Sequence, residues 1–517
     1  MQASNRIIVN TLAQYIRTIL NMLLSLISVR LVLNILGETD YGIYSLVAGV
    51  VSMLSFFTNS LIYSTQRFLS IHQGKGDVIL LKSVFSNSLL LHIVIGFIVL
   101  IILECMTPFL FDGFLNIPAE RLDAASIIYQ MVVIMVYISF IAAPYRALLI
   151  SRENIVYTSI IDVCDGILKV VFVIILIYLP GDKLIEYSWI LMGIAVFNLL
   201  AFAVFSHIKY EECTMPRIKY INKKYLKELG VFTGWETFST LCLALRNQGL
   251  SIVLNRVKGT AINAAYGIGM QITGMVSFVS SSLGNAIAPQ LMAAKGANDR
   301  DKMWFLAEFQ SKFSYLLLAM VGIPTMFVMQ ALLELWLGKV PEYTMTFGCM
   351  FISAQIIDML TTGLSTTKKA IGNIGKYTLM TYTPKLLILP LGWFALRCGL
   401  PMIWVAILFV GVEAFCMYLR IPLLKGADGF NASAFCKNVM VKSILPTVVS
   451  IAACILVSYV PKFPAGFLLA YVVSIPLFII TTYKWSLSAP EKRKVDSIMH
   501  GFKTKFKSWR YNNAKTD

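Results

Sequence analysis

Polar and charged residues recur at helical spacing inside long apolar segments of this sequence. In the first segment they form one face of a helix, made of Asn10, Gln14, Arg17, Asn21, Ser25 and Ser28. A charge at membrane depth is costly, so it usually faces a cavity or a partner. Helix packing through small polar residues is the alternative. The combination of Arg17 with Asn21 favours the cavity.

Three further cations lie in the same way inside later apolar segments, namely Lys169, Arg246 and Lys385. Cations around one cavity repel each other unless an anion or nearby carboxylates compensate. Guanidinium groups match phosphate oxygens bidentately, and lysine acts as a point charge. We therefore interpret Arg17, Asn21, Lys169, Arg246 and Lys385 as a binding site for an anionic, phosphate-bearing headgroup.

Carboxylates accompany these cations and are candidates for binding a coupling cation or a proton: Asp162, Asp165, Glu236 and Asp358. Asp165 and Lys169 have the i, i+4 spacing of a helical ion pair, so a purely structural role stays open for each carboxylate. Arg30 and Asp40 lie near the end of the first segment and are candidates for a gate or a structural lock.

Other kinds of chemistry lack their motifs. The run Gly372-Asn373-Ile374-Gly375-Lys376-Tyr377 resembles a phosphate-binding loop but lacks its first glycine and the Ser or Thr after the lysine. The nine cysteines are scattered singly, without metal or redox spacing. We expect neither an enzyme nor a metal or cofactor site, while coupling to Na⁺ or H⁺ stays open.

The elements that carry these residues must be transmembrane helices. The chain is 57% hydrophobic and 14% charged, with a mean hydropathy of +0.74, whereas soluble domains are about 25% charged. A span needs roughly 20 apolar residues, which predicts an all-α polytopic membrane protein of about fourteen helices. The predicted spans lie near 9–36, 41–64, 84–111, 123–145, 155–179, 185–207, 229–255, 262–291, 311–337, 343–366, 377–397, 401–422, 442–460 and 464–484.

An internal repeat predicts the organisation of these helices. Tyr41-Gly42-Ile43 recurs as Tyr266-Gly267-Ile268, and Asn154-Ile155 recurs as Asn373-Ile374. Two parallel six-helix lobes with a site between them are a transporter architecture. We therefore expect an N-lobe at 1–208, a cytoplasmic linker at 209–228, a C-lobe at 229–424, two C-terminal helices within 425–485 and a basic cytoplasmic tail at 486–517.

Basic residues concentrate in every second connection between the predicted helices, above all in the linker with Lys219, Lys223, Lys224 and Lys227. By the positive-inside rule these connections and both termini are cytoplasmic. The net charge of +17 thus reflects membrane orientation, and we expect no nucleic-acid partner. The basic tail is expected to touch anionic membrane lipids.

The stretch from Arg30 to Gly49, which includes Asp40-Tyr41-Gly42, resembles the signature after helix 1 in Wzx-type flippases. These belong to the multidrug/oligosaccharidyl-lipid/polysaccharide exporter (MOP) superfamily. The resemblance implies outward flipping, by alternating access, of undecaprenyl-pyrophosphate-linked oligosaccharide repeat units for O-antigen or capsule. It also implies the bacterial cytoplasmic (inner) membrane, with a polysaccharide polymerase and chain-length machinery as candidate partners.

Two alternatives stay open within that superfamily. Flippases of lipid II resemble the chain through helix 1 arginines, which Arg17 or Arg30 match, and through Asp40. They carry an arginine in helix 8, however, where this sequence has Gln271. Multidrug exporters of the MATE type are expected to have an acidic lumen, opposite in sign to the cations described above.

The predicted topology can be tested with a single cysteine placed between Lys219 and Lys227 of an otherwise Cys-free variant. We expect it to be shielded from an impermeant thiol reagent in intact cells, because this connection is predicted to be cytoplasmic. Labelling of permeabilised cells serves as the control. Labelling of intact cells would reverse the topology.

Overall fold

The computed structural model describes residues 3–52, 55–111, 117–215, 218–427, 429–459, 467–489, 491–493 and 496, and this described part is helical throughout, without a strand. Of the basic cytoplasmic tail predicted at 486–517, residues 490, 494, 495 and 497–517 lie outside it. The helices of the first part of the chain are α1 (Ala3–Ser52), α2 (Ser55–Lys75), α3 (Val78–Phe109), α4 (Leu122–Ser151), α5 (Ile155–Leu176), α6 (Lys183–Lys209), α7 (Lys223–Lys258) and α8 (Thr260–Gly296).

Apart from α9, the remaining helices are shorter, and several are interrupted. They are α9 (Arg300–Phe327), α10 (Met329–Leu337), α11 (Thr344–Met359), α12 (Thr362–Ile371), α13 (Gly375–Tyr382), α14 (Ile388–Arg397), α15 (Met402–Arg420), α16 (Ala432–Phe435), α17 (Lys442–Ser458) and α18 (Phe467–Thr481). A 3-10 turn, Thr383–Leu387, separates α13 from α14. Proline at its second position removes a backbone N–H, which explains the break in the helix.

The chain is a multi-span membrane protein. Among the described residues, 8 helical segments are long and apolar enough to cross a membrane, or up to 10 if two bent pairs each count as one span. These pairs are α9 with α10, bent by 74°, and α11 with α12, bent by 51°. α5 is not among the eight, since Asp162, Asp165 and Lys169 all lie within its 22 residues.

Local sequence explains several helix boundaries. The predicted break after residue 36 is a kink within α1, where Gly37 adopts a φ of 77°, a conformation that favours glycine. Asp77 and Asp182 cap α3 and α6 by accepting hydrogen bonds from backbone N–H groups of the first turn. Both caps fall where the apolar runs begin.

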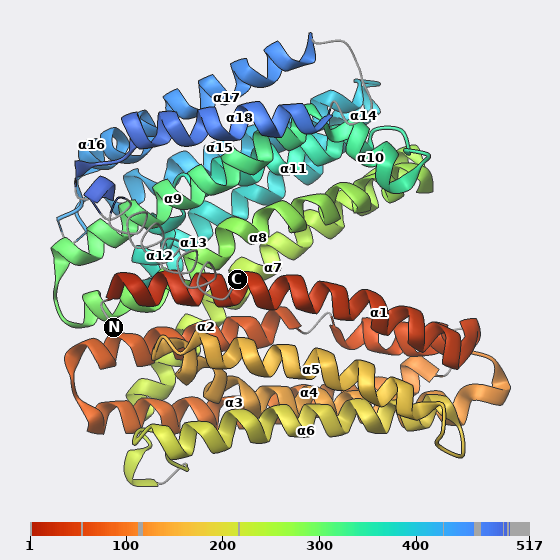
Figure 1. Ribbon diagram of the computed structural model, residues 1–517. Helices are drawn as coiled ribbons and strands as arrows, with labels where there is room; N and C mark the ends of the chain where they lie inside the picture. The colour runs from red at the N-terminus through yellow and green to blue at the C-terminus, as the bar shows by residue number, and fades with distance from the viewer. Residues whose placement is uncertain are drawn as a thin grey trace, which may run out of the picture. The chain divides into compact units, whose positions relative to one another are not determined.

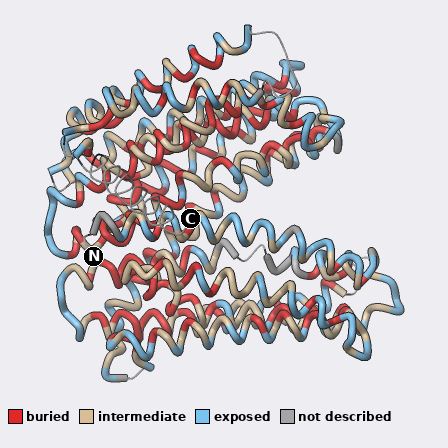
Figure 2. The backbone as a smooth tube through the Cα atoms, viewed as in Figure 1, coloured by how far each residue is buried: buried red, intermediate tan, exposed pale blue. Residues whose placement is uncertain are grey.

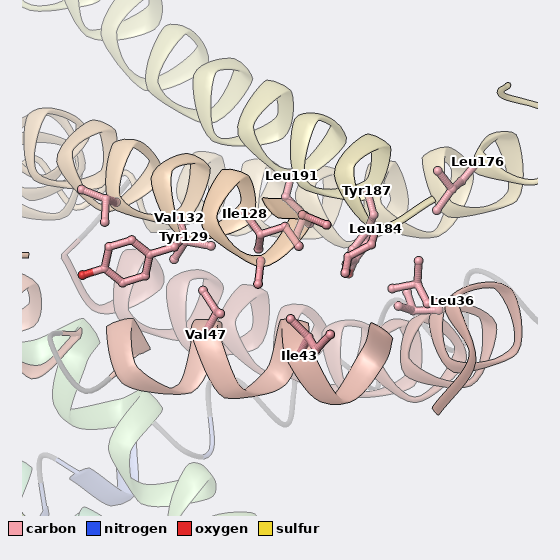
Figure 3. Packing of buried hydrophobic residues seen from close by; sticks show 14 of the residues in the cluster. Leu36, Ile43, Val47, Ile128, Tyr129, Val132, Leu176, Leu184, Tyr187 and Leu191 are labelled. Atoms are coloured by element: carbon pink, nitrogen blue, oxygen red, sulfur yellow. The ribbon is translucent and has the colours of Figure 1, made fainter. Parts of the chain in front are cut away.

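By contacts the chain forms two compact units, one of Met1–Leu250, Ser281–Ala307 and Leu364–Leu389, and one of the rest. In the first unit α4 packs against α6, α3 and α2, and α1 packs along α5 (Figure 1). A buried cluster joins Ile43 and Val47 of α1 to Ile128 of α4 and Tyr187 of α6 (Figure 3). Exposed residues recur along the helices, where they include large apolar side chains such as Ile98 of α3, as well as at the connecting turns (Figure 2).

In the second unit α11 packs against α15, and α17 against α18. A separate apolar cluster includes Leu318 and Ile323 of α9, Ile352 of α11 and Phe478 of α18. Gly269 of α8 lets α11 approach, because a Cβ there would lie 2.9 Å from the Cβ of Phe347. This is the close packing for which glycine is used between membrane helices.

The ends of α2 and α8 touch backbone to backbone within the first unit. A Cβ on Gly74 would collide with the carbonyl oxygen of Ala293, and a Cβ on Gly296 with the carbonyl oxygen of Ile71. Since the colliding atoms belong to the backbone, no side-chain rotation relieves the clash. Glycine at both positions is what lets the two helices meet here.

We expect Gly296→Ala to lower the free energy of unfolding by about 1–3 kcal/mol, the usual cost of overpacking. Gly193→Ala is the matched control, since a Cβ there meets nothing within 4 Å and alanine is the better helix former. Thermal unfolding of both variants in the same detergent measures the difference. An unchanged melting temperature of Gly296→Ala would contradict the close contact.

Candidate functional site

Two arginines from different helices share one carboxylate in the first unit. Arg17 of α1 donates from Nη1 to Asp162 Oδ2 of α5 at 2.8 Å. Arg146 of α4 binds both oxygens of the same carboxylate, at 3.1 and 2.7 Å. The exposed fraction of the side chain is 23% for Arg17, 32% for Arg146 and 18% for Asp162. This cluster therefore holds one more positive than negative charge and remains partly accessible.

Close packing of α1 on α5 positions the cluster. A Cβ on Gly166 would lie 2.9 Å from Leu24 Cδ1 and 3.2 Å from Asn21 Oδ1, so only a small residue allows this approach. Gly166 follows Asp162 by one helical turn, and Asn21 follows Arg17 by one turn. The buried Oδ1 of Asn21 has no hydrogen-bond partner among the described residues.

The predicted polar face of the first helix divides into two parts. Asn10 donates to the carbonyl oxygen of Glu153 at 2.9 Å, and Gln14 to that of Ser282 at 3.2 Å. Both side chains are buried. The helix-packing alternative thus describes Asn10 and Gln14, whereas Arg17 and Asn21 lie with Asp162 and Gly166.

The predicted ion pair on α5 is confirmed. Lys169 Nζ lies 2.7 Å from Asp165 Oδ2, and Asn198 of α6 donates to the other oxygen of Asp165 at 2.6 Å. Lys169 is 41% exposed. Its charge is balanced by Asp165, in contrast to the excess positive charge around Asp162.

Glu236 of α7 also has a cationic partner. Lys369 Nζ of α12 donates to Glu236 Oε1 at 2.6 Å and lies 4.7 Å from the centre of the Tyr63 ring. Both members of the pair are largely buried, with side chains 14% and 7% exposed for Lys369 and Glu236. Glu236 therefore belongs to a neutral buried pair that ties α7 to α12.

The other two predicted cations of the headgroup site lie on different elements. Arg246 of α7 donates from Nε to Asn247 Oδ1 at 3.0 Å. Lys385 is buried in the 3-10 turn after α13 and lies 5.6 Å from the ring centre of Tyr382. Gly249 of α7 packs on Leu389 of α14, the helix that follows the 3-10 turn of Lys385. The contact places α7 next to α14.

The remaining candidates take part in ion pairs or lie at the surface. Asp358 of α11 accepts from Arg420 Nη2 of α15 at 2.6 Å, within the second unit. Asp40 binds Arg121, which also donates to Asp182 at 2.5 Å. Arg30 is exposed.

The Asp40–Arg121–Asp182 group lies where three helix ends of the first unit meet. Burial raises the pKa of the Asp182 carboxyl, but hydrogen bonds from Arg121 and from two backbone N–H groups outweigh this and lower it below its ordinary value. Asp182 is also the cap of α6. Asp40 thus belongs to an ion-pair group that joins α1, just after its kink, to the beginnings of α4 and α6.

Arg146 and Lys369 were not among the candidates predicted from the sequence, because the predicted spans end at 145 and 366 and leave both residues in the connections that follow. Both lie instead on helices that continue beyond the predicted spans, α4 to Ser151 and α12 to Ile371. A signal was present for Arg146, since the apolar run Ala147-Leu148-Leu149-Ile150 follows it directly. The pairing of Lys369 with Glu236 has no such local signal.

No metal site is present in the described part of the chain: it contains no group of three or more His, Cys, Asp or Glu side chains that could hold an ion. None of the nine cysteines, all of which are described, forms a disulfide.

Comparison with known proteins places the chain in a family. Residues 7–294 match the family described as "Polysaccharide biosynthesis protein". The "Uncharacterized membrane protein EpsK" of Bacillus subtilis is 21% identical over 347 residues, which cover 67% of this chain and 68% of that protein. The family match includes Arg17, Arg146 and Asp162.

Solved structures show the fold. A MOP superfamily transporter from Pyrococcus furiosus, whose binding pocket is described as having reverse polarity, has a TM-score of 0.68 at 15% identity and covers 84% of this chain and 97% of its own. A MATE structure in the bent conformation has a TM-score of 0.71 at 15% identity, with the same coverage. The chain therefore has a MATE-like fold, is a multi-span membrane protein and belongs to the polysaccharide biosynthesis protein family.

Proposed function

We propose that this membrane protein is an exporter of the MOP superfamily that flips undecaprenyl-pyrophosphate-linked oligosaccharide repeat units from the cytoplasmic to the periplasmic leaflet of a bacterial inner membrane. The observation that carries the proposal is the carboxylate of Asp162 shared by Arg17 and Arg146. The two arginines, on α1 and α4, carry one positive charge more than Asp162 compensates. This excess positive charge suits a pyrophosphate. Membership of the polysaccharide biosynthesis protein family supports the oligosaccharide part of the substrate.

Binding in this proposal uses the hydrogen-bond donors of the two arginines that remain free while Asp162 holds them. Asp162 holds the two guanidinium groups in place while no substrate is bound, which limits the cost of keeping two cations at membrane depth. A pyrophosphate then accepts charge-assisted hydrogen bonds from the guanidinium atoms that Asp162 does not occupy. Because the carboxylate remains, the site releases the anion more readily than two unpaired arginines would.

The proposal includes the finer architecture expected from the sequence. In this proposal the chain has about fourteen helices, which form two parallel lobes that alternate access around the site. Both termini are then cytoplasmic. Lys169, Arg246 and Lys385 extend the anionic headgroup site, while Asp165, Glu236 and Asp358 stay candidates for coupling to Na⁺ or H⁺. No nucleotide is required, so the membrane potential or an ion gradient supplies the energy.

A drug exporter is the second candidate, and a specific observation favours it. One similar structure, with a TM-score of 0.69 at 15% identity, is described as a multidrug resistance MATE family transporter. Charge distinguishes the two candidates, since an organic cation is repelled by the excess positive charge around Asp162. A lipid II flippase differs from the main proposal only in the sugar and peptide that follow the same pyrophosphate.

Substitution of Arg17 tests the anion site. We expect Arg17→Lys to keep partial export and Arg17→Gln to lose most of it, because a charge-assisted hydrogen bond contributes about 1.5–3 kcal/mol, roughly tenfold or more in affinity. Export is measured as surface polysaccharide in a strain lacking its own flippase, with the membrane amount of each variant as a check on folding. Arg256→Gln, an exposed cation at the end of α7, is the control.

The result that opposes the proposal is normal export by Arg17→Gln at normal abundance. Resistance to cationic dyes conferred by the wild-type chain would then favour the drug exporter.

Lys385 offers a second test, because it is buried in a helix interruption. If its charge holds pyrophosphate, Lys385→Arg should export better than Lys385→Gln, and Arg246→Lys better than Arg246→Gln. A structural hydrogen bond predicts instead that each Gln variant equals the variant with the swapped cation. The same export assay gives the ranking, and equal export would remove these two residues from the headgroup site.

A further inference from the structure

A second cationic site lies in the first unit, away from Asp162. A cavity of about 740 Å³ opens between the end of α2, the beginning of α7 and the connection from α12 to α13. We propose that this cavity binds the phosphate of an anionic membrane lipid, with the headgroup inside and the acyl chains outside. The proposal goes beyond substrate transport, because it concerns a resident lipid rather than the transported one.

The charges of the lining are strongly unequal. Four cations contribute, Arg67, Lys75, Lys224 and Lys227, against the single carboxylate of Glu228. Lys75, Lys224 and Lys227 are exposed. Among the described residues, none of these three lysines has a carboxylate within ion-pair distance. An anion that enters the cavity therefore meets ammonium groups that need not give up a partner.

Arg67 forms a fixed base for the site. It donates from Nε to the carbonyl oxygen of Lys369 and from Nη2 to that of Ala370 at 3.1 Å. Its guanidinium lies 4.7 Å from the ring centre of Phe68 and 4.5 Å from that of Phe232, and the residue is 8% exposed. Neither hydrogen bond uses Nη1, so a pre-oriented donor remains for a phosphate.

Part of the lining is apolar, which favours a lipid over a soluble anion, although His72, Tyr225 and Asn373 also line the cavity. Val231, Phe232 and Trp235 of α7 line the cavity together with Ile371 and Ile374. Trp235 packs its indole on Gly375 and is half-buried. Basic pockets between membrane helices on the cytoplasmic side are typical sites for phospholipid headgroups. The lysine-rich beginning of α7 belongs to the connection that the positive-inside rule predicts to be cytoplasmic.

Binding here has a structural consequence within the first unit. The lining residues come from α2, α7 and the α12–α13 connection, and Arg67 already bonds the last turn of α12. A phosphate bound to Arg67 and to Lys224 or Lys227 ties the third element, α7, to the other two. We therefore expect the bound lipid to stabilise this arrangement of helix ends.

Thermal unfolding of the purified full-length chain in detergent tests the proposal. We expect phosphatidylglycerol to raise the melting temperature in a saturable way and phosphatidylcholine to leave it unchanged. The double variant Lys224→Gln, Lys227→Gln removes two exposed cations and should weaken the apparent affinity for phosphatidylglycerol roughly tenfold or more. The control is the double variant Lys295→Gln, Lys302→Gln, which removes two cations of the α8–α9 region outside the cavity. It should leave the apparent affinity for phosphatidylglycerol unchanged.

Three outcomes would overturn the proposal. Equal losses in the two double variants would show diffuse attraction to the basic surface instead of a site. Protection by inorganic phosphate or pyrophosphate equal to that by phosphatidylglycerol would assign the cavity to a soluble anion. Equal protection by phosphatidylcholine would remove the role of charge. Because none of these measurements uses transport, failure here is distinguishable from failure of the flippase proposal.

Discussion

The carboxylate of Asp162 holds guanidinium groups from α1 and α4, and the packing of three helices depends on this contact. An arginine at membrane depth is costly unless it is paired or faces water. Asp162 neutralises the charge of one arginine. The partial exposure of both arginines lowers the cost of the second charge. Gly166, one turn further along α5, allows the close approach of α1 that makes the contact. The charge that makes α5 unlike a typical span is thus also what places it beside α1.

Sequence periodicity could predict the contacts that lie within one helix. The bounds of α5 and α6 agree with the predicted spans within a few residues, and the Asp165–Lys169 pair follows directly from its spacing. Apolar runs and capping aspartates are local features, so a single sequence carries them. The predicted lobes and the full set of about fourteen helices stay predictions, since they concern relations between distant segments.

Pairings between helices could not be predicted, because the paired residues are far apart in the sequence. Lys369 and Glu236 are 133 residues apart, and Arg17 and Asp162 are 145 apart. Positive-inside counting assigned Arg146 and Lys369 to connections because it ends each helix at the membrane boundary. The single spans predicted at 311–337 and 343–366 correspond to bent pairs. Pro324 was a signal for the first bend, since proline disrupts helical hydrogen bonding, but the second bend has no proline nearby.

The charged groups of the first unit differ in what they can offer to an anion. In the Lys369–Glu236 pair the cation has its own carboxylate, which repels an incoming phosphate about as much as the cation attracts it. Around Asp162 one carboxylate serves two arginines, so attraction prevails there. The cavity beside Arg67 has a still larger excess of cations, but it lies at helix ends with partly apolar walls. A transported pyrophosphate must be released, so the small excess of positive charge around Asp162 suits it. A resident lipid stays bound, so the larger excess of cations in the cavity beside Arg67 suits it.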